Sequence, residues 1–270
     1  VSTLPRIFSI FINPSNNEVL GDQKLLTVLS GAINRDELVK NVLDGFGVSL
    51  YGPLPENNYP KYIKTLSAEE AGVALDELGW KLNGENIRNK EINKKKVYLS
   101  FTLSTSDAPE LSETARMVSE MMATVGVEIK VQPYEIGTLN QDIIRPRDYE
   151  MLLFGQVLAS DTDLYSFWHS SQRNDPGIHV GKYASVRADS LLEQAVEEID
   201  REEQEKLLAE AADVIARENG AIFLYAPSYI YALNKDIGNL SINKISSTVD
   251  RFANIEDWYV LTERVWKIFK

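Results

Sequence analysis

A strand–helix–strand pattern in the middle of the chain restricts the possible folds more than any other feature. Residues 97–103 alternate between apolar and polar side chains, as a half-buried strand does. Asp107 is the expected N-cap of a helix with one apolar face, and Gly126 is its expected end. Residues 127–131 alternate again, and 151–154 form a third, fully apolar strand. Short connections of this kind predict a right-handed crossover and a parallel sheet, so the fold class is α/β.

The N-terminal third adds a strand and two helices to this prediction. Residues 7–13 are β-branched and aromatic, which predicts a buried strand, and 22–45 have the apolar spacing of one helix. Residues 46–66 are expected to be a long ordered loop. A capping box opens a short helix over 67–79, and 81–96 are expected to be a mobile polar turn.

Two helices and a strand are predicted in the C-terminal half. The first helix carries apolar residues through Val196 and Ile199, and the second begins at the cap pair Asp200 and Glu203. Residues 221–225 then form another buried strand. The whole is a mixed sheet with a parallel βαβ core flanked by helices.

Composition excludes several classes of function. The chain has 270 residues, no cysteine, two histidines and a net charge of −12. The acidic balance argues against binding to nucleic acid, and the lack of cysteine removes disulfides, thiol nucleophiles and Cys-ligated metals. No apolar run approaches the length of a membrane span. We expect no metal and no cofactor.

Known catalytic motifs are also missing from the sequence. It contains no Gly-x-Ser-x-Gly elbow, no phosphate-binding glycine loop and no His-Glu-x-x-His motif. We therefore predict that the protein is not an enzyme. Hydrolysis by a pair of carboxylates remains open, because the chain has 40 acidic residues.

The segment 155–172 is the candidate binding site, because it follows the third strand at its carboxyl end, where α/β sheets bind ligands. It combines carboxylates, aromatic rings, an imidazole and amides, a set that suits an amphiphilic ligand. Each has a structural alternative: an aspartate can cap the next turn, one ring of the Phe-Trp pair can enter the core, and the histidine can be structural. The candidate residues are Gly155, Gln156, Asp161, Asp163, Tyr165, Phe167, Trp168 and His169.

Several motifs, in the same order along nearly the whole chain, resemble the C-terminal lobe of the family 5 extracellular solute-binding proteins. They are the segment Leu29–Val39, the loop Gly52-Pro53-Leu54-Pro55, the helix Ala71–Trp80 ending in Gly-Trp, the strand entry Arg147–Met151 and the strand Ala221–Tyr225.

The resemblance implies a type II periplasmic-binding-protein lobe within a two-lobed clamp. Residues 1–270 would be the C-terminal ligand-binding lobe, with a large N-terminal lobe missing, and about 235–270 would be the segment that returns to it. The apolar groups of 250–252 and 258–262 would then pack against this lobe or against a second copy, giving a dimer.

The resemblance also implies a function: the substrate-binding component of an ABC importer, which captures short peptides without chemistry and delivers them to a membrane permease. Asp161, or else Asp163, would meet the peptide α-amino group. Family members often have Trp at the position of Gln156, so a metal chelate, a sugar or another solute remains open, as does a sensory or chaperone-like receptor. The protein would be extracellular or periplasmic, with a lipid anchor, if it has one, upstream of Val1. The isolated lobe should bind its ligand weakly.

Overall fold

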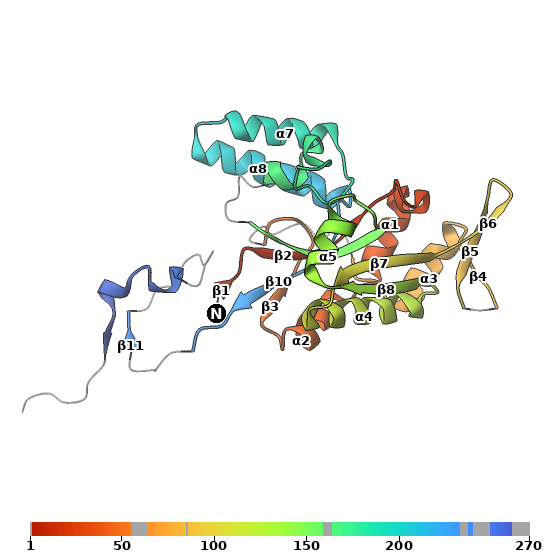
Figure 1. Ribbon diagram of the computed structural model, residues 1–270, viewed down its shortest axis with the longest axis horizontal. Coiled ribbons are helices and arrows are strands. Elements are labelled where there is room, and N and C mark those ends of the chain that lie inside the picture. Colours follow the sequence, from red (N-terminus) through yellow and green to blue (C-terminus); the bar gives the residue numbers. More distant parts are fainter. Residues whose placement is uncertain are drawn as a thin grey trace, which may run out of the picture.

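The computed structural model describes residues 2–55, 64–84, 86–158, 164–232, 237–239 and 249–260. Its centre is one seven-stranded sheet with helices on both faces (Figure 1). The predicted α/β class is confirmed.

The central sheet has the strand order β1-β10-β2-β9-β7-β8, and β3 pairs with β10 beside this path. β7 is parallel to β8 and β9, whereas β2 is antiparallel to β9 and β10. The sheet is therefore mixed, with the parallel pairs at one side. Its strands are β1 (Ser2–Thr3), β2 (Arg6–Ile12), β3 (Gly47–Ser49), β7 (Ser100–Ser106), β8 (Glu128–Tyr134), β9 (Met151–Val157) and β10 (Ile222–Tyr229).

Helix α4 (Pro109–Thr124) makes the predicted crossover between β7 and β8. The expected cap was wrong: the N-cap is Ala108, which makes no side-chain cap bond, and Pro109 follows it. Proline suits this position because its missing N–H would have no partner there anyway. The backbone N–H of Asp107 instead donates to the Tyr134 carbonyl at 2.9 Å or less, which ties the two parallel strands together. Gly126 ends the turn with φ +81°, as expected.

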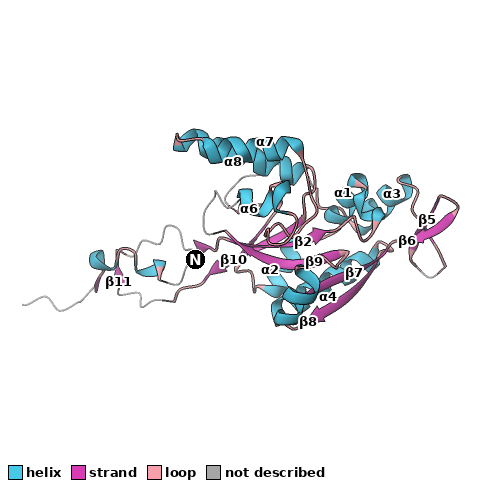
Figure 2. Cartoon of the chain, turned by 45° about the horizontal axis from the view of Figure 1, so that its top comes forward, coloured by secondary structure: helices cyan, strands magenta, loops and turns pink. Residues whose placement is uncertain are grey.

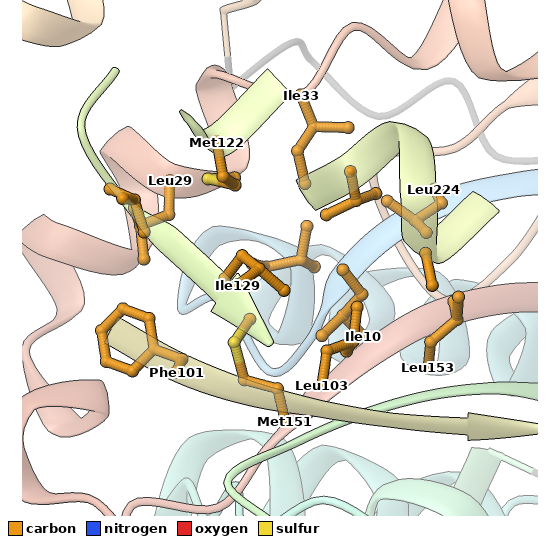
Figure 3. Close-up of a cluster of buried hydrophobic side chains, with 14 of the residues drawn as sticks. Ile10, Leu29, Ile33, Phe101, Leu103, Met122, Ile129, Met151, Leu153 and Leu224 are labelled. Carbon is orange, nitrogen blue, oxygen red and sulfur yellow. The ribbon is translucent and has the colours of Figure 1, made fainter. Parts of the chain in front are cut away.

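Each face of the sheet covers its own hydrophobic core. One core lies between the sheet and the helices α1 to α4, and Figure 3 shows its side chains converging, including Ile10 from β2, Leu153 from β9 and Met122 from α4. The other lies under α6, α7 and α8 and takes Ile7, Phe11 and Leu152 from the alternate strand positions. This alternation is the period-2 pattern of a sheet buried on both faces.

Figure 1 places α7 and α8 above the sheet and α2 and α4 below it. The remaining helices with their bounds are α1 (Gln23–Gly31), α2 (Arg35–Val42), α3 (Ala68–Glu77), α5 (Ile136–Thr138), α6 (Leu164–Trp168), α7 (Val186–Glu197) and α8 (Arg201–Arg217), with the short turns η1 (Glu18–Gly21), η2 (Leu139–Ile144) and η4 (Ser170–Gln172).

The single helix predicted over 22–45 was wrong, because the chain forms α1 and α2 in its place. Asn34 lies between them in an extended conformation, and its side chain accepts from the Glu37 backbone N–H. An asparagine N-cap competes with continuation of a helix. The capping boxes predicted elsewhere fare better: Ser67 and Glu70 cap α3 reciprocally, and Asp200 caps α8.

The mobile polar turn predicted over 81–96 was also wrong. The segment forms a three-stranded sheet of β4 (Lys81–Leu82), β5 (Arg88–Ile92) and β6 (Lys95–Tyr98), drawn at the right of Figure 1. Asn93 and Lys94 both have positive φ, the geometry of a two-residue hairpin turn. Buried Arg88 holds this sheet to the domain by donating to the carbonyls of Trp80 and Val125. The strand predicted over 97–103 is accordingly divided between β6 and β7.

The C-terminal half shows one wrong apolar stripe and one separate element. α7 ends at Glu197, and Ile199 beyond it is 96% exposed. Past β10, β11 (Ile237–Gly238) pairs with β12 (Tyr259–Val260), with the turns η5 (Asp250–Phe252) and η6 (Ile255–Asp257) between them. Figures 1 and 2 show this part away from the sheet, so its packing against another lobe or copy stays a prediction.

Candidate functional site

A pocket of about 600 Å³ lies beside the carboxyl-terminal half of β9. Three of the sequence candidates line it: Gly155, Gln156 and Phe167. Its wall is completed by the end of η2 and by the loop before α7. The lining residues are Ile144, Arg145, Arg147, Phe154, Gly155, Gln156, Val157, Phe167, Asp175, Pro176, Gly177, Ile178 and Val180.

Arg147 holds the loop that forms the far wall. Its Nη2 donates to the carbonyls of Gly177 (2.8 Å) and His179 (3.3 Å), and its Nε donates to the Arg173 carbonyl (3.3 Å). The side chain of Asn13, at the end of β2, in turn donates to the Arg147 carbonyl. Arg147 is therefore a positioning residue. Sequence reasoning assigned it no such role, because its partners lie about 30 positions further along the chain.

One side of β9 lacks a neighbouring strand where it borders the pocket. β2 pairs with β9 over its whole length, from Ile12 opposite Met151 to Arg6 opposite Val157. β7 pairs only with residues 151–153 on the other side. Within the described part of the chain, no strand pairs with this second edge from residue 154 onward. An exposed strand edge of this kind can accept an extended chain as an additional strand.

Gly155 is required by packing on the opposite face of β9. A Cβ at this position would lie 2.7 Å from Cε1 of Phe8. The Phe8 ring is itself 8% exposed and packs against Tyr225, with 5.2 Å between the ring centroids. Any side chain at residue 155 would therefore displace a ring of the first core.

Gln156 brings an unusual group to the pocket. Its side chain is 4% exposed, and neither its Oε1 nor its Nε2 has a hydrogen-bond partner among the described residues. A buried amide without partners costs free energy, so such a group calls for an explanation. A ligand amide would supply the missing donor and acceptor together.

The adjacent aromatic residues Phe167 and Trp168 point in different directions, as expected. Trp168 is 0% exposed and packs in the second core against Phe223 (5.4 Å between ring centroids) and Phe11 (6.0 Å). Phe167 is half-buried and lines the pocket. The burial of Trp168 assigns it to the core.

His169 is also held by partners within the chain. It is 6% exposed, with Nδ1 2.8 Å from Ser171 Oγ and Nε2 3.3 Å from Glu193 Oε1. Its ring stacks on that of Tyr165 at 4.3 Å. Neither residue is among the described residues that line the pocket, so both have a structural arrangement here.

Asp161 and Asp163 lie outside the described residues, within the segment 159–163. Their roles stay predictions. The described residues contain no group of three or more His, Cys, Asp or Glu side chains placed to hold a metal ion. Among the helices that the structure describes, none has the length and apolarity to cross a membrane.

Replacing Gln156 by leucine should stabilise the protein. Gln156→Leu removes the buried unpaired amide at similar volume, so we expect a gain of about 1 kcal/mol in the free energy of unfolding, measured by urea denaturation. Gln194→Leu is the control, because Gln194 is exposed on α7 and should change stability by less than about 0.5 kcal/mol. A clear loss in Gln156→Leu would mean that the amide is already paired.

The sequence and structure were compared with known proteins. The description "Bacterial extracellular solute-binding proteins, family 5 Middle" matches residues 2–176. The oligopeptide-binding protein AppA of Bacillus subtilis is 32% identical over 255 residues, which is 90% of this chain and 45% of AppA. Protein XP55 of Streptomyces lividans is 27% identical over 82% of this chain and 40% of its own length. The chain thus spans about half the length of these relatives.

Solved structures agree with this match. AppA of Bacillus subtilis in complex with a nonapeptide has a TM-score of 0.75 and 28% identity, covering 96% of this chain and 51% of that one. NikZ of Campylobacter jejuni in complex with Ni(L-His) has a TM-score of 0.72 at 22% identity, covering 95% and 52%, and shows the shared fold alone. The fold is that of the type II periplasmic binding proteins, and the chain belongs to family 5 of the bacterial extracellular solute-binding proteins.

Proposed function

We propose that this chain forms the ligand-gripping part of an ABC importer's substrate-binding component, and that its ligand is a short peptide. The observation that carries the proposal is the unpaired edge of β9 beside the pocket, with the buried, unpartnered amide of Gln156 at that edge. An extended peptide adds to a strand edge through its main chain, which is independent of its sequence. The similar AppA structure, whose own ligand is a nonapeptide, supports the same class of ligand.

The pocket offers different chemistry to the peptide's side chains. Phe154 and Phe167 provide apolar wall, while Arg145 and Asp175 place opposite charges in its lining. Side chains of a bound strand alternate in direction, so every second one would enter this pocket. A lining with both apolar and charged groups accepts varied side chains without selecting one.

We assign the α-amino group of the peptide to Asp161, with Asp163 as the second candidate. This assignment rests on the family resemblance. A carboxylate next to an ammonium group forms a charge-assisted hydrogen bond, about twice as strong as a neutral one.

The proposed mechanism involves no chemistry. Residues 1–270 would act as the C-terminal lobe of a two-lobed clamp, and about 235–270 would connect to the other lobe. A ligand that touches both lobes selects the closed state, which then docks on a membrane permease. The protein would work outside the cytoplasmic membrane, in the extracellular or periplasmic space, with or without a lipid anchor.

A non-peptide solute is the second candidate. The same fold occurs in NikZ with Ni(L-His) and in a Thermotoga maritima protein with bound mannohexaose. Gln156, at the position where many family members have tryptophan, favours a ligand that needs an amide contact in place of ring stacking.

Native mass spectrometry tests the ligand class. The protein is expressed with whatever residues its gene encodes on either side of this chain, purified without added ligand and denatured to release bound molecules. A ladder of short peptides supports the proposal. A metal complex, a sugar or one defined metabolite overturns the peptide assignment.

Asp161→Asn then tests the contact to the α-amino group. Losing a charge-assisted hydrogen bond should weaken peptide binding about 10- to 100-fold, measured by calorimetry. Glu202→Gln, an exposed change on α8, is the control and should leave affinity unchanged. If Asp161→Asn binds as tightly as the parent, the same measurement on Asp163→Asn decides between the two residues.

A further inference from the structure

Three positively charged side chains gather near the end of β2 without an acidic partner. Arg147 donates to backbone carbonyls, Arg173 Nε donates to the Ser170 carbonyl at 2.9 Å, and Lys182 Nζ donates to Asn174 Oδ1 at 3.4 Å. None of the ion pairs among the described residues includes any of the three. This is unexpected in a chain with net charge −12.

The three charges act on one another. Partial burial lowers the pKa of Lys182, and the positive charges of Arg147 and Arg173 lower it further. Like charges held together in a partly desolvated place raise the free energy of the folded protein. A bound anion would offset this repulsion.

A pocket of about 300 Å³ opens at the two more accessible members of the group. It is lined by Pro14, Ser15, Arg173, Asn174 and Lys182. A guanidinium, an ammonium, an amide and a hydroxyl can all donate hydrogen bonds, and the lining contains no carboxylate. A planar guanidinium fork beside an ammonium is a donor set that matches a phosphate group.

This pocket is separate from the proposed peptide site. The two share no lining residue, and the loop 173–178 runs between them, clipped by Arg147. Pro14 and Ser15 follow the end of β2 that pairs with Met151, whereas the unpaired edge of β9 begins at residue 154 and runs to the other end. Occupation of one pocket does not require the other.

We propose that the end of β2 carries a phosphate-binding site formed by Arg173 and Lys182, with Ser15 and Asn174 as further donors. Phosphate suits the group better than a carboxylate does, because it has more acceptor oxygens and carries up to two negative charges near neutral pH. The phosphate can be the free ion or the phosphoryl group of a larger molecule, and the site recognises the same chemistry in both.

Calorimetric titration of the 270-residue chain with inorganic phosphate tests the site, at pH 7.5 and with chloride used to hold the ionic strength constant. We expect saturable binding to one site. Arg173→Gln and Lys182→Gln should each weaken it at least about tenfold, the usual effect of losing one charged hydrogen bond. Lys90→Gln is the matched control, since Lys90 is half-buried and donates to the Leu78 carbonyl at 2.8 Å.

Thermal unfolding separates binding from a folding defect. Without phosphate, Lys182→Gln should melt no lower than the parent, because one of the repelling charges is gone. With phosphate, its melting temperature should rise less than that of the parent. Competition by glycerol 3-phosphate identifies the source: tighter binding than inorganic phosphate indicates an organic phosphoryl group, and weaker binding indicates the free ion. No saturable binding, or equal affinity in the parent and both site variants, overturns the proposal.

Discussion

Replacement of Arg35 by methionine should lower the free energy of unfolding by about 3–5 kcal/mol, the usual cost of breaking a buried charged network. The side chain is 0% exposed and donates hydrogen bonds within the chain. Nε donates to the carbonyls of Leu50 (2.9 Å) and Phe223 (2.7 Å), and Nη1 donates to those of Ser30 (2.9 Å) and Ile33 (3.3 Å). Methionine fills much of the space but supplies no donor.

The size of this effect follows from what Arg35 connects. It stands at the start of α2 and joins the end of α1, the residue after β3 and the strand β10. Burial lowers its pKa to about 10, so the guanidinium remains charged at neutral pH. Arg35→Lys should not rescue stability, because an ammonium cannot reproduce the planar fork.

Urea denaturation at pH 7 measures the loss. Arg187→Met is the control, because Arg187 is exposed on α7 and pairs with Glu210 on the surface, where an ion pair contributes at most about 1 kcal/mol. A loss below about 1 kcal/mol in Arg35→Met would contradict the network as described.

The second large effect is a loss of stability in acid caused by His179. This side chain is 0% exposed, and burial is the main reason that its pKa falls from 6.5 to about 3. The positive charges of Arg147 and Arg173 lower it further, whereas Asp189 and the His169 backbone act in the opposite direction.

The direction of the effect follows from proton linkage. Between pH 6.5 and about pH 3 the unfolded chain binds a proton at His179 that the folded chain does not bind. Stability from this group is therefore complete above pH 6.5 and decreases as the pH falls. At about 1.4 kcal/mol per pH unit, the loss between pH 7 and pH 4.5 should be about 2–3 kcal/mol.

A comparison of variants isolates this contribution from that of the carboxylates. Urea denaturation is repeated from pH 7 to pH 4.5 for the parent, His179→Gln and His179→Leu. Both variants lack the titrating ring, so their stability should change less with pH than that of the parent, whatever their stability at pH 7. An unchanged slope in both would show that His179 titrates normally in the folded protein.

Much of the framework was predictable because it depends on local chemistry. The alternation of residues 97–103 and 127–131, with a one-faced helix between them, predicted the parallel β7–α4–β8 unit. Ser67 with Glu70, and Asp200, predicted the starts of α3 and α8, because a cap acts within three residues. The errors at Asn34 and at Asn93 are local signals that were outweighed by the surrounding apolar or polar pattern.

For the candidate site, the sequence predicted where it lies along the chain. The segment after the strand 151–154 was expected to bind ligand, and Gly155, Gln156 and Phe167 do line a pocket there. It did not predict the loop 175–178 as the opposite wall, because Arg147 attaches that loop through hydrogen bonds between distant residues. Trp168 and His169 have the same composition signal as Phe167, but packing directs them into the structure.

The sequence by itself determined the α/β class, the order of the main strands and helices, and the family. These depend on periodicity, caps and motifs that are read along the chain. Only the tertiary structure decided which side chains share a pocket, which edge of β9 is unpaired, and that Arg173 and Lys182 meet beside the end of β2. Those features are produced by long-range pairing and burial, in which a residue's partners lie far away in sequence.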